Sequence, residues 1–180
     1  GINNDLLFIT YCPKNIEVID LKTMKPLTGI KNNIIPIEKH KFGIDYHCFV
    51  PLTMNNEKLM NNFILFCRNT GLLIKYDEQN KTFDYEKLPI CPAFNDFTAY
   101  SFVYIYDFIF LFGGRNSKYE ITKNVYKYSM KEKTWNECKF ALPMEISFSV
   151  AILSNDNPNV HVIGGWNADF KEQKMHVSVN

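Results

Sequence analysis

Short apolar runs alternate with polar turn segments along most of the chain. The runs FILFC at residues 63–67 and FIFLF at residues 108–112 are continuously apolar, which is typical of strands covered on both faces. Turn segments such as Glu78-Gln79-Asn80 separate neighbouring runs. No segment shows a sustained helical period. The pattern therefore predicts an all-β protein built from many short strands.

A repeat of about 51 residues orders these strands. In its clearest copy, the run FIFLFGG at residues 108–114 precedes the strand NVYKYS and then a strand that begins near Trp135. In the copy before it, Tyr76 and Phe83 stand where Tyr128 and Trp135 stand later, with six residues between the two aromatics in both copies. One further apolar strand precedes each copy, so each unit is predicted to hold four strands.

The pair of glycines after the apolar strand is not present in every copy. Gly113-Gly114 and Gly164-Gly165 are intact, whereas Cys67 and Arg68 occupy these positions in the earlier copy. A weaker copy opens the chain with LLFITY at residues 6–11. We therefore expect four units, at about residues 5–40 without its first strand, 45–90, 96–143, and 147–180 without its last strand.

A glycine pair after an apolar strand, followed by Tyr128 and Trp135, resembles the kelch repeat, and the resemblance covers essentially the whole chain. It implies a kelch-type β-propeller with four-stranded antiparallel blades. Glycines allow the strand end to turn with positive φ, and we expect the two aromatics to pack against the next blade. The strands make about three and a half blades, whereas propellers close with about four to eight. We therefore expect a propeller fragment, an incomplete ring whose missing blades come from a longer parent chain or from self-association.

Composition limits the classes of partner and the cellular compartment that we expect. Hydrophobic residues make up 46% of the chain and the formal net charge is +1, which argues against nucleic acid and anionic membrane surfaces as partners. No apolar stretch is long enough to cross a bilayer and no secretory leader is visible, so we expect a soluble, cytoplasmic protein. Five cysteines, an odd number without a Cys-x-x-Cys pair, are expected to be free thiols in a reducing compartment.

Candidate binding residues follow the glycine positions. Arg68 and Arg115 are the two arginines of the chain, and both lie where an apolar strand ends: Arg115 directly follows Gly113-Gly114, and Arg68 directly follows Cys67. The stretch Gly113-Gly114-Arg115-Asn116-Ser117 is similar to a loop of some BTB-kelch ubiquitin-ligase adaptors, in which the arginine binds an acidic peptide. With Trp166 after the next glycine pair, Arg68, Arg115 and Asn116 form a candidate partner-binding rim. The alternative is that the arginines face solvent or are paired within the molecule.

The histidines and paired carboxylates of the chain favour a binding function over a catalytic one. Among His40, His47, His161 and His176 no two have metal-ligand spacing, and His161 lies in an apolar strand where a hydrogen-bonded core histidine is expected. Paired carboxylates fall on turns and outer strands. We therefore predict a non-catalytic kelch-repeat scaffold that binds a protein or peptide, including an acidic segment, without catalytic residues, metal or cofactor. The alternatives are a propeller enzyme similar to galactose oxidase and an actin-associated kelch protein.

Overall fold

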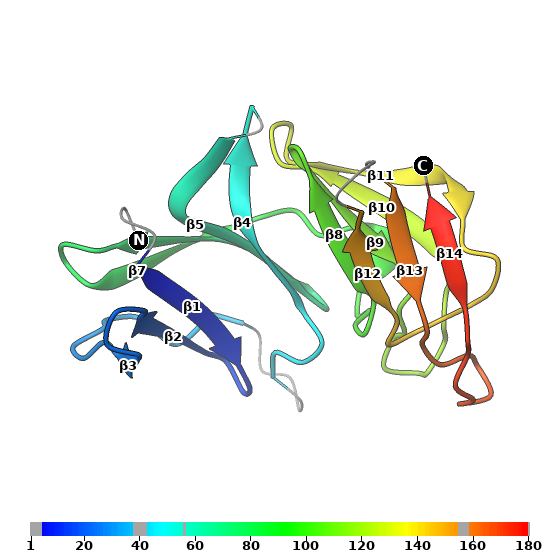
Figure 1. The fold of residues 1–180 in the computed structure, drawn as a ribbon, viewed down its shortest axis with the longest axis horizontal. Helices are drawn as coiled ribbons and strands as arrows, with labels where there is room; N and C mark the ends of the chain where they lie inside the picture. Colours follow the sequence, from blue (N-terminus) through cyan, green and yellow to red (C-terminus); the bar gives the residue numbers. More distant parts are fainter. Residues whose placement is uncertain (1–4, 38–42, 56, 155–158, 180) are drawn as a thin grey trace.

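A computed structural model of the chain describes residues 5–37, 43–55, 57–154 and 159–179. Its strands form four antiparallel sheets that follow one another along the sequence and are arranged in an arc that does not close (Figure 1). One short 3₁₀ helix, Pro92–Phe94, lies between the second sheet and the third. No helix of the described residues is long and apolar enough to span a membrane. The prediction of an all-β chain of antiparallel sheets in an incomplete ring is confirmed.

Each sheet is a consecutive set of antiparallel strands. The first has the order β1-β2-β3 and the fourth the order β12-β13-β14, whereas the second and third have four strands each. The bounds are β1 Leu6–Tyr11, β2 Asn15–Asp20, β3 Lys25–Pro26; β4 Cys48–Met54, β5 Glu57–Cys67, β6 Thr70–Asp77, β7 Thr82–Lys87; β8 Ser101–Ile105, β9 Phe108–Phe112, β10 Asn124–Ser129, β11 Thr134–Ala141; β12 Val150–Leu153, β13 Val160–Ile163, β14 His176–Val179.

The hydrophobic core is divided into three clusters, one between each pair of consecutive sheets. Ile16 and Phe83 belong to the cluster between the first and second sheets, and Phe66 and Tyr128 to the one between the second and third. The third cluster includes Val162, between the third and fourth sheets. Each sheet can therefore bury both of its faces only by packing on two neighbours.

The aromatic residues that define the repeat join each sheet to the one before it. The ring centroid of Phe66 on β5 lies 4.9 Å from that of Tyr128 and 4.8 Å from that of Trp135. Phe8 on β1 has the same relation to Tyr76, at 5.3 Å, and to Phe83. The expectation that these aromatics pack against the next blade was wrong in direction, because their strands direct them toward the preceding sheet.

The two terminal sheets each expose an apolar face. Leu7 and Ile9 on β1 are 41% and 37% exposed, whereas Ile109 and Leu111, at the equivalent positions of β9, are 0% and 2% exposed. The difference arises because the second sheet covers β9 on that side, and no described residues cover β1 there. The far face of the fourth sheet is similarly open, since Val150 and its neighbour Ile152 are exposed.

Candidate partner-binding site

Arg115 lies at the start of the loop between β9 and β10. Its backbone exchanges two hydrogen bonds of 2.8 Å with Thr98, in the segment that enters the third sheet. The guanidinium carbon lies 4.6 Å from the centre of the Phe148 ring and 5.3 Å from that of Tyr119. Both distances are within the range of cation–π attraction, so the guanidinium is held between two aromatic rings.

Trp166 occupies the equivalent position of the next repeat. Its backbone exchanges hydrogen bonds of 2.9 and 2.7 Å with Ser147, as that of Arg115 does with Thr98. The side chain is exposed, and Ser147 directly precedes Phe148, the residue on which Arg115 stacks. The structure therefore places Trp166 and Arg115 on consecutive, equivalent loops at the same end of their sheets.

Asn116 holds its loop in shape. Its side-chain oxygen accepts hydrogen bonds of 3.0 Å from the backbone N–H groups of Lys118 and Glu120, and its side-chain nitrogen donates to the Glu120 carboxylate at 2.6 Å. Asn167 makes the same backbone contacts one repeat later. The Asn116 amide is therefore engaged within the loop, which fixes the position of the residues on either side of it.

Sequence reasoning missed two residues that these loops display. Tyr119 and Phe170, each three residues after the loop asparagine, have positive φ and side chains exposed by 60% and 52%. Their ring centroids are 5.9 Å apart, so the two loops meet through them. The signal that could have found them is the pattern Gly-Gly-x-Asn-x-x-aromatic, which both copies share.

An aromatic–arginine surface results at this end of the arc. Tyr46, which precedes β4, contacts Phe148 at a centroid distance of 4.7 Å in edge-to-face geometry. Contacts then continue from Phe148 to Arg115, to Tyr119 and to Phe170. We call the surface formed by Tyr46, Arg115, Tyr119, Phe148 and Phe170 the aromatic–arginine surface. It joins residues from the second, third and fourth sheets.

Arg68 lies apart from this surface in a two-residue turn between β5 and β6. Its side chain is only 10% exposed, and a guanidinium nitrogen lies 3.3 Å from a carboxylate oxygen of Asp96. Asp96 also accepts hydrogen bonds from the Ser117 hydroxyl and, at 3.2 Å, from the Ser117 N–H. Arg68 is thus paired within the molecule, and Asp96 links its turn to the loop that carries Arg115.

The electrostatics of Asp96 show the strength of this link. Burial acts to raise the pKa of the carboxyl group, but hydrogen bonds from Ser117 and the charge of Arg68 outweigh burial and lower the pKa below its ordinary value. A carboxyl group whose pKa is lowered in the folded state stabilises the fold at pH values above its ordinary pKa. This stabilisation is lost as the pH falls through the folded-state pKa.

We therefore expect wild-type stability to fall more steeply on acidification than that of Asp96→Asn. At pH 6 the Asp96→Asn variant is less stable than the wild type, because the charged hydrogen-bond acceptor is gone. Near pH 3 the difference in stability between the two proteins narrows. The urea midpoint of both proteins at the two pH values measures the effect. Asp84→Asn, a change at an exposed carboxylate, serves as the control, and equal acid sensitivity of wild type and Asp96→Asn would contradict the role of Asp96.

The other candidate groups are dispersed. No group of three or more His, Cys, Asp or Glu side chains that could hold a metal is found among the described residues. A nitrogen of His47 lies 2.6 Å from the Thr10 hydroxyl, and burial lowers the pKa of this histidine. Cys48, Cys67 and Cys91 are buried, and burial raises the pKa of each thiol.

The sequence-based interpretation of His161 needs correction. It is only half-buried, and its Nδ1 lies 3.0 Å from Nε2 of His176 on the adjacent strand β14. The antiparallel register of β13 and β14 places both rings on one face of the sheet, although 15 residues separate them in sequence. His161 is therefore one of a surface pair and not a core histidine, while His40 lies outside the described residues.

Comparison with known proteins agrees with the fold. Residues 98–139 match the Kelch motif, and a search of curated proteins finds no match. Among solved structures, the chain is similar to one titled "Structure of YjhT", a kelch-type propeller protein, with a TM-score of 0.51 and 17% sequence identity. The similarity covers 67% of this chain and 36% of that one, so the chain spans only part of the neighbour's length. The chain carries a kelch motif and has the fold of part of a kelch-type β-propeller.

Proposed function

We propose that the chain is a non-catalytic scaffold that binds a protein or peptide segment through the loops at one end of its sheets. The observation that carries this proposal is the aromatic–arginine surface, in which the guanidinium group of Arg115 lies against the rings of Phe148 and Tyr119. The exposed rings of Tyr46 and Phe170 extend this surface on either side. Tyrosine, tryptophan and arginine are the residues most enriched at the energetic centres of protein interfaces. Rigid aromatic side chains also lose little conformational entropy when they bind.

Arg115 gives the surface a preference for acidic segments. Contacts with the rings of Phe148 and Tyr119 hold the guanidinium in place. A guanidinium group can donate two parallel hydrogen bonds from its nitrogen edge. A carboxylate matches that geometry, whereas a neutral amide does not. We therefore propose a segment with an acidic residue beside an apolar one, the acid on Arg115 and the apolar side chain on Tyr119 and Phe170.

Loss of Arg115 should weaken this binding without unfolding the protein. With a peptide selected from a library on the wild-type chain, Arg115→Ala is expected to reduce affinity at least about tenfold, because a charge-assisted hydrogen bond contributes about 1.5–3 kcal/mol. Arg115→Lys keeps the charge but not the paired donors, and should recover only part of the affinity. Fluorescence anisotropy measures both.

The arginine of the second sheet supplies the contrast. Arg68→Ala removes a largely buried side chain paired with Asp96, so it should lower the urea midpoint while changing peptide affinity less than Arg115→Ala does. Lys139→Ala, at an exposed position of β11, controls for the loss of a positive charge. If Arg115→Ala and Lys139→Ala bind the selected peptides equally well, the aromatic–arginine surface is not the binding site.

We further propose that the open faces of the terminal sheets are covered in the working assembly. The exposed Leu7 and Ile9 at one end and Val150 and Ile152 at the other are apolar positions whose counterparts in the middle sheets are packed. Further blades of a longer chain, or a second copy of this chain, would bury them. Contiguous apolar faces of this kind mark interaction surfaces in soluble proteins.

A further inference from the structure

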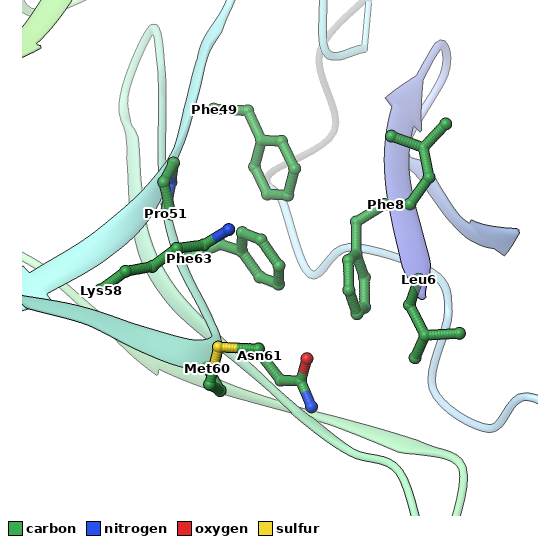
Figure 2. A pocket seen from close by; sticks show the side chains of 9 residues that line it. Leu6, Phe8, Phe49, Pro51, Lys58, Met60, Asn61 and Phe63 are labelled. Atoms are coloured by element: carbon green, nitrogen blue, oxygen red, sulfur yellow. The ribbon is translucent and has the colours of Figure 1, made fainter. Parts of the chain in front are cut away.

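Pockets lie at two interfaces between consecutive sheets. The pocket between the first and second sheets has a volume of about 350 Å³ and is lined by Phe8, Phe49, Phe63 and Lys58 (Figure 2). The pocket between the second and third sheets, which we call the second pocket, has a volume of about 290 Å³. This volume is close to the lower end of the range of about 300–1,000 Å³ that small-molecule sites occupy. The second pocket is therefore large enough for a small ligand.

One part of the second pocket is apolar and is held in place by contacts between the two sheets. Strands β4 and β5 supply most of this part through Leu52, Met54, Leu59 and Ile64. Met130, directly after β10, is buried and lines the same pocket. The backbone N–H of Thr53 donates a 3.4 Å hydrogen bond to the Met130 sulfur, which joins the second sheet to the third beside the pocket.

Other elements supply the charged groups of the second pocket. They are Lys75 of β6, Glu86 of β7, and Lys131 and Lys133 of the turn between β10 and β11. The Glu86 carboxylate lies 2.7 Å from Nζ of Lys133 and 3.7 Å from Nζ of Lys75. Lys131 makes no ion pair with any described residue. The one carboxylate is thus already engaged, and the pocket keeps a net positive charge.

Tyr128 also lines the second pocket, and its hydroxyl lacks an acceptor. The side chain is 0% exposed, and the hydroxyl has no hydrogen-bond partner among the described residues. Burial and, to a smaller extent, the charge of Glu86 raise the pKa of Tyr128, so the hydroxyl keeps its proton and lies near the charged groups. A buried donor without an acceptor is unfavourable, and an oxygen atom of a ligand would relieve that cost.

We propose that the second pocket binds a small amphipathic carboxylate, a ligand with one acid group on an apolar body. The carboxylate accepts hydrogen bonds from the Tyr128 hydroxyl and from the ammonium group of Lys131, and the apolar body lies on the side chains of β4 and β5. The lysines disfavour a cation in this pocket. A hydrocarbon would leave the Tyr128 hydroxyl without an acceptor.

The position of the second pocket makes it independent of the other surfaces. Its walls belong to the two middle sheets, each of which packs on a neighbour on both faces. Lys131 and Lys133 follow β10, whereas Arg115 precedes it, so the pocket lies at the end of the sheets opposite the aromatic–arginine surface. A ligand in the pocket therefore leaves the proposed peptide site free.

Titration calorimetry of the full chain with decanoate, below its micelle concentration, tests the site. We expect saturable binding of one decanoate per chain, and much weaker binding of decyltrimethylammonium, which has the same alkyl chain and the opposite charge. Lys131→Glu and Tyr128→Phe should each weaken decanoate binding at least about fivefold, because each removes a hydrogen bond to the carboxylate. Tyr128→Phe removes no hydrogen bond of the free chain, so its effect reports on the ligand.

Three further variants locate the ligand. Leu59→Trp places a larger side chain at a partly exposed wall of the second pocket and should abolish decanoate binding. Lys58→Glu, in the pocket of Figure 2, and Arg115→Ala should leave it unchanged. Equal affinity for decanoate and decyltrimethylammonium would show adsorption on exposed apolar surface. Loss of binding in Lys58→Glu would place the ligand in the other pocket, and wild-type affinity of Tyr128→Phe would show that the hydroxyl does not contact it. Each of these results would overturn the proposal.

Discussion

Gly113→Ala is expected to destabilise the fold by about 3 kcal/mol or more, whereas Gly164→Ala, the same change one repeat later, should cost only about 1 kcal/mol. Both glycines have positive φ, 64° and 66°, so an L-side chain is strained at either position. A Cβ at Gly113 would in addition lie 2.4 Å from the carbonyl oxygen of Ile146. At Gly164 the nearest atom would be 3.9 Å away.

The difference comes from the neighbouring sheet. Ile146 belongs to the segment that enters the fourth sheet, and its carbonyl accepts a 2.8 Å hydrogen bond from the N–H of Gly114. The backbone cannot withdraw from a new Cβ at Gly113 without breaking this bond. Urea unfolding of the two variants measures the costs, with Gly29→Ala as a control for positive φ in open space. Equal losses for Gly113→Ala and Gly164→Ala would show that close packing on the glycine pair is unimportant.

Two substitutions of Tyr128 are expected to change the stability of the fold in opposite directions. Tyr128→Ala should cost about 3–5 kcal/mol, because it removes a large buried ring and leaves a cavity. The side chain is 0% exposed and its ring lies 4.9 Å from that of Phe66 and 5.0 Å from that of Trp135. Tyr128→Phe keeps these contacts and should instead stabilise the fold by about 1 kcal/mol, because it removes a hydroxyl that is costly to bury.

The hydroxyl of Tyr128 is the reason for the second effect. It is buried and has no hydrogen-bond partner among the described residues, and burial raises the pKa of Tyr128 to about 12. Thermal and urea unfolding of both variants test the pair of predictions. Tyr104→Ala and Tyr104→Phe, on an exposed side chain of β8, should each change stability by less than about 0.5 kcal/mol. A destabilised Tyr128→Phe would show that the hydroxyl has a favourable interaction.

The repeat made the architecture predictable because it records inter-sheet packing directly in the sequence. Tyr128 and Trp135 recur as Tyr76 and Phe83 since each pair fills the same space against the preceding sheet. The direction of that packing could not be predicted, because a strand pattern shows which residues are buried but not which neighbour covers them. Only the positions of Phe8 and Phe66 on the preceding sheet settle it.

The candidate site was harder to predict because its contacts cross between sheets. Arg115 and Trp166 follow glycine pairs, and this local signal was sufficient to select them. The stacking of Arg115 on Phe148 joins residues 33 positions apart and depends on how two sheets sit against each other. Arg68 carries the same local signal as Arg115, but the sequence does not reveal that Asp96 lies within 3.3 Å of it. Pairing across sheets therefore separates two arginines that look alike in the sequence.

The division of the core into three clusters has a consequence for how the chain unfolds. Each cluster joins only two consecutive sheets. The free energy of unfolding is therefore a sum of contributions from neighbouring pairs of sheets, with little contribution from contacts between sheets at opposite ends of the arc. Among the described residues, the first and fourth sheets each pack on one neighbouring sheet, while the second and third each pack on two. Unfolding can then begin at either end and spread inward, so that the two middle sheets form the last cooperative unit to melt.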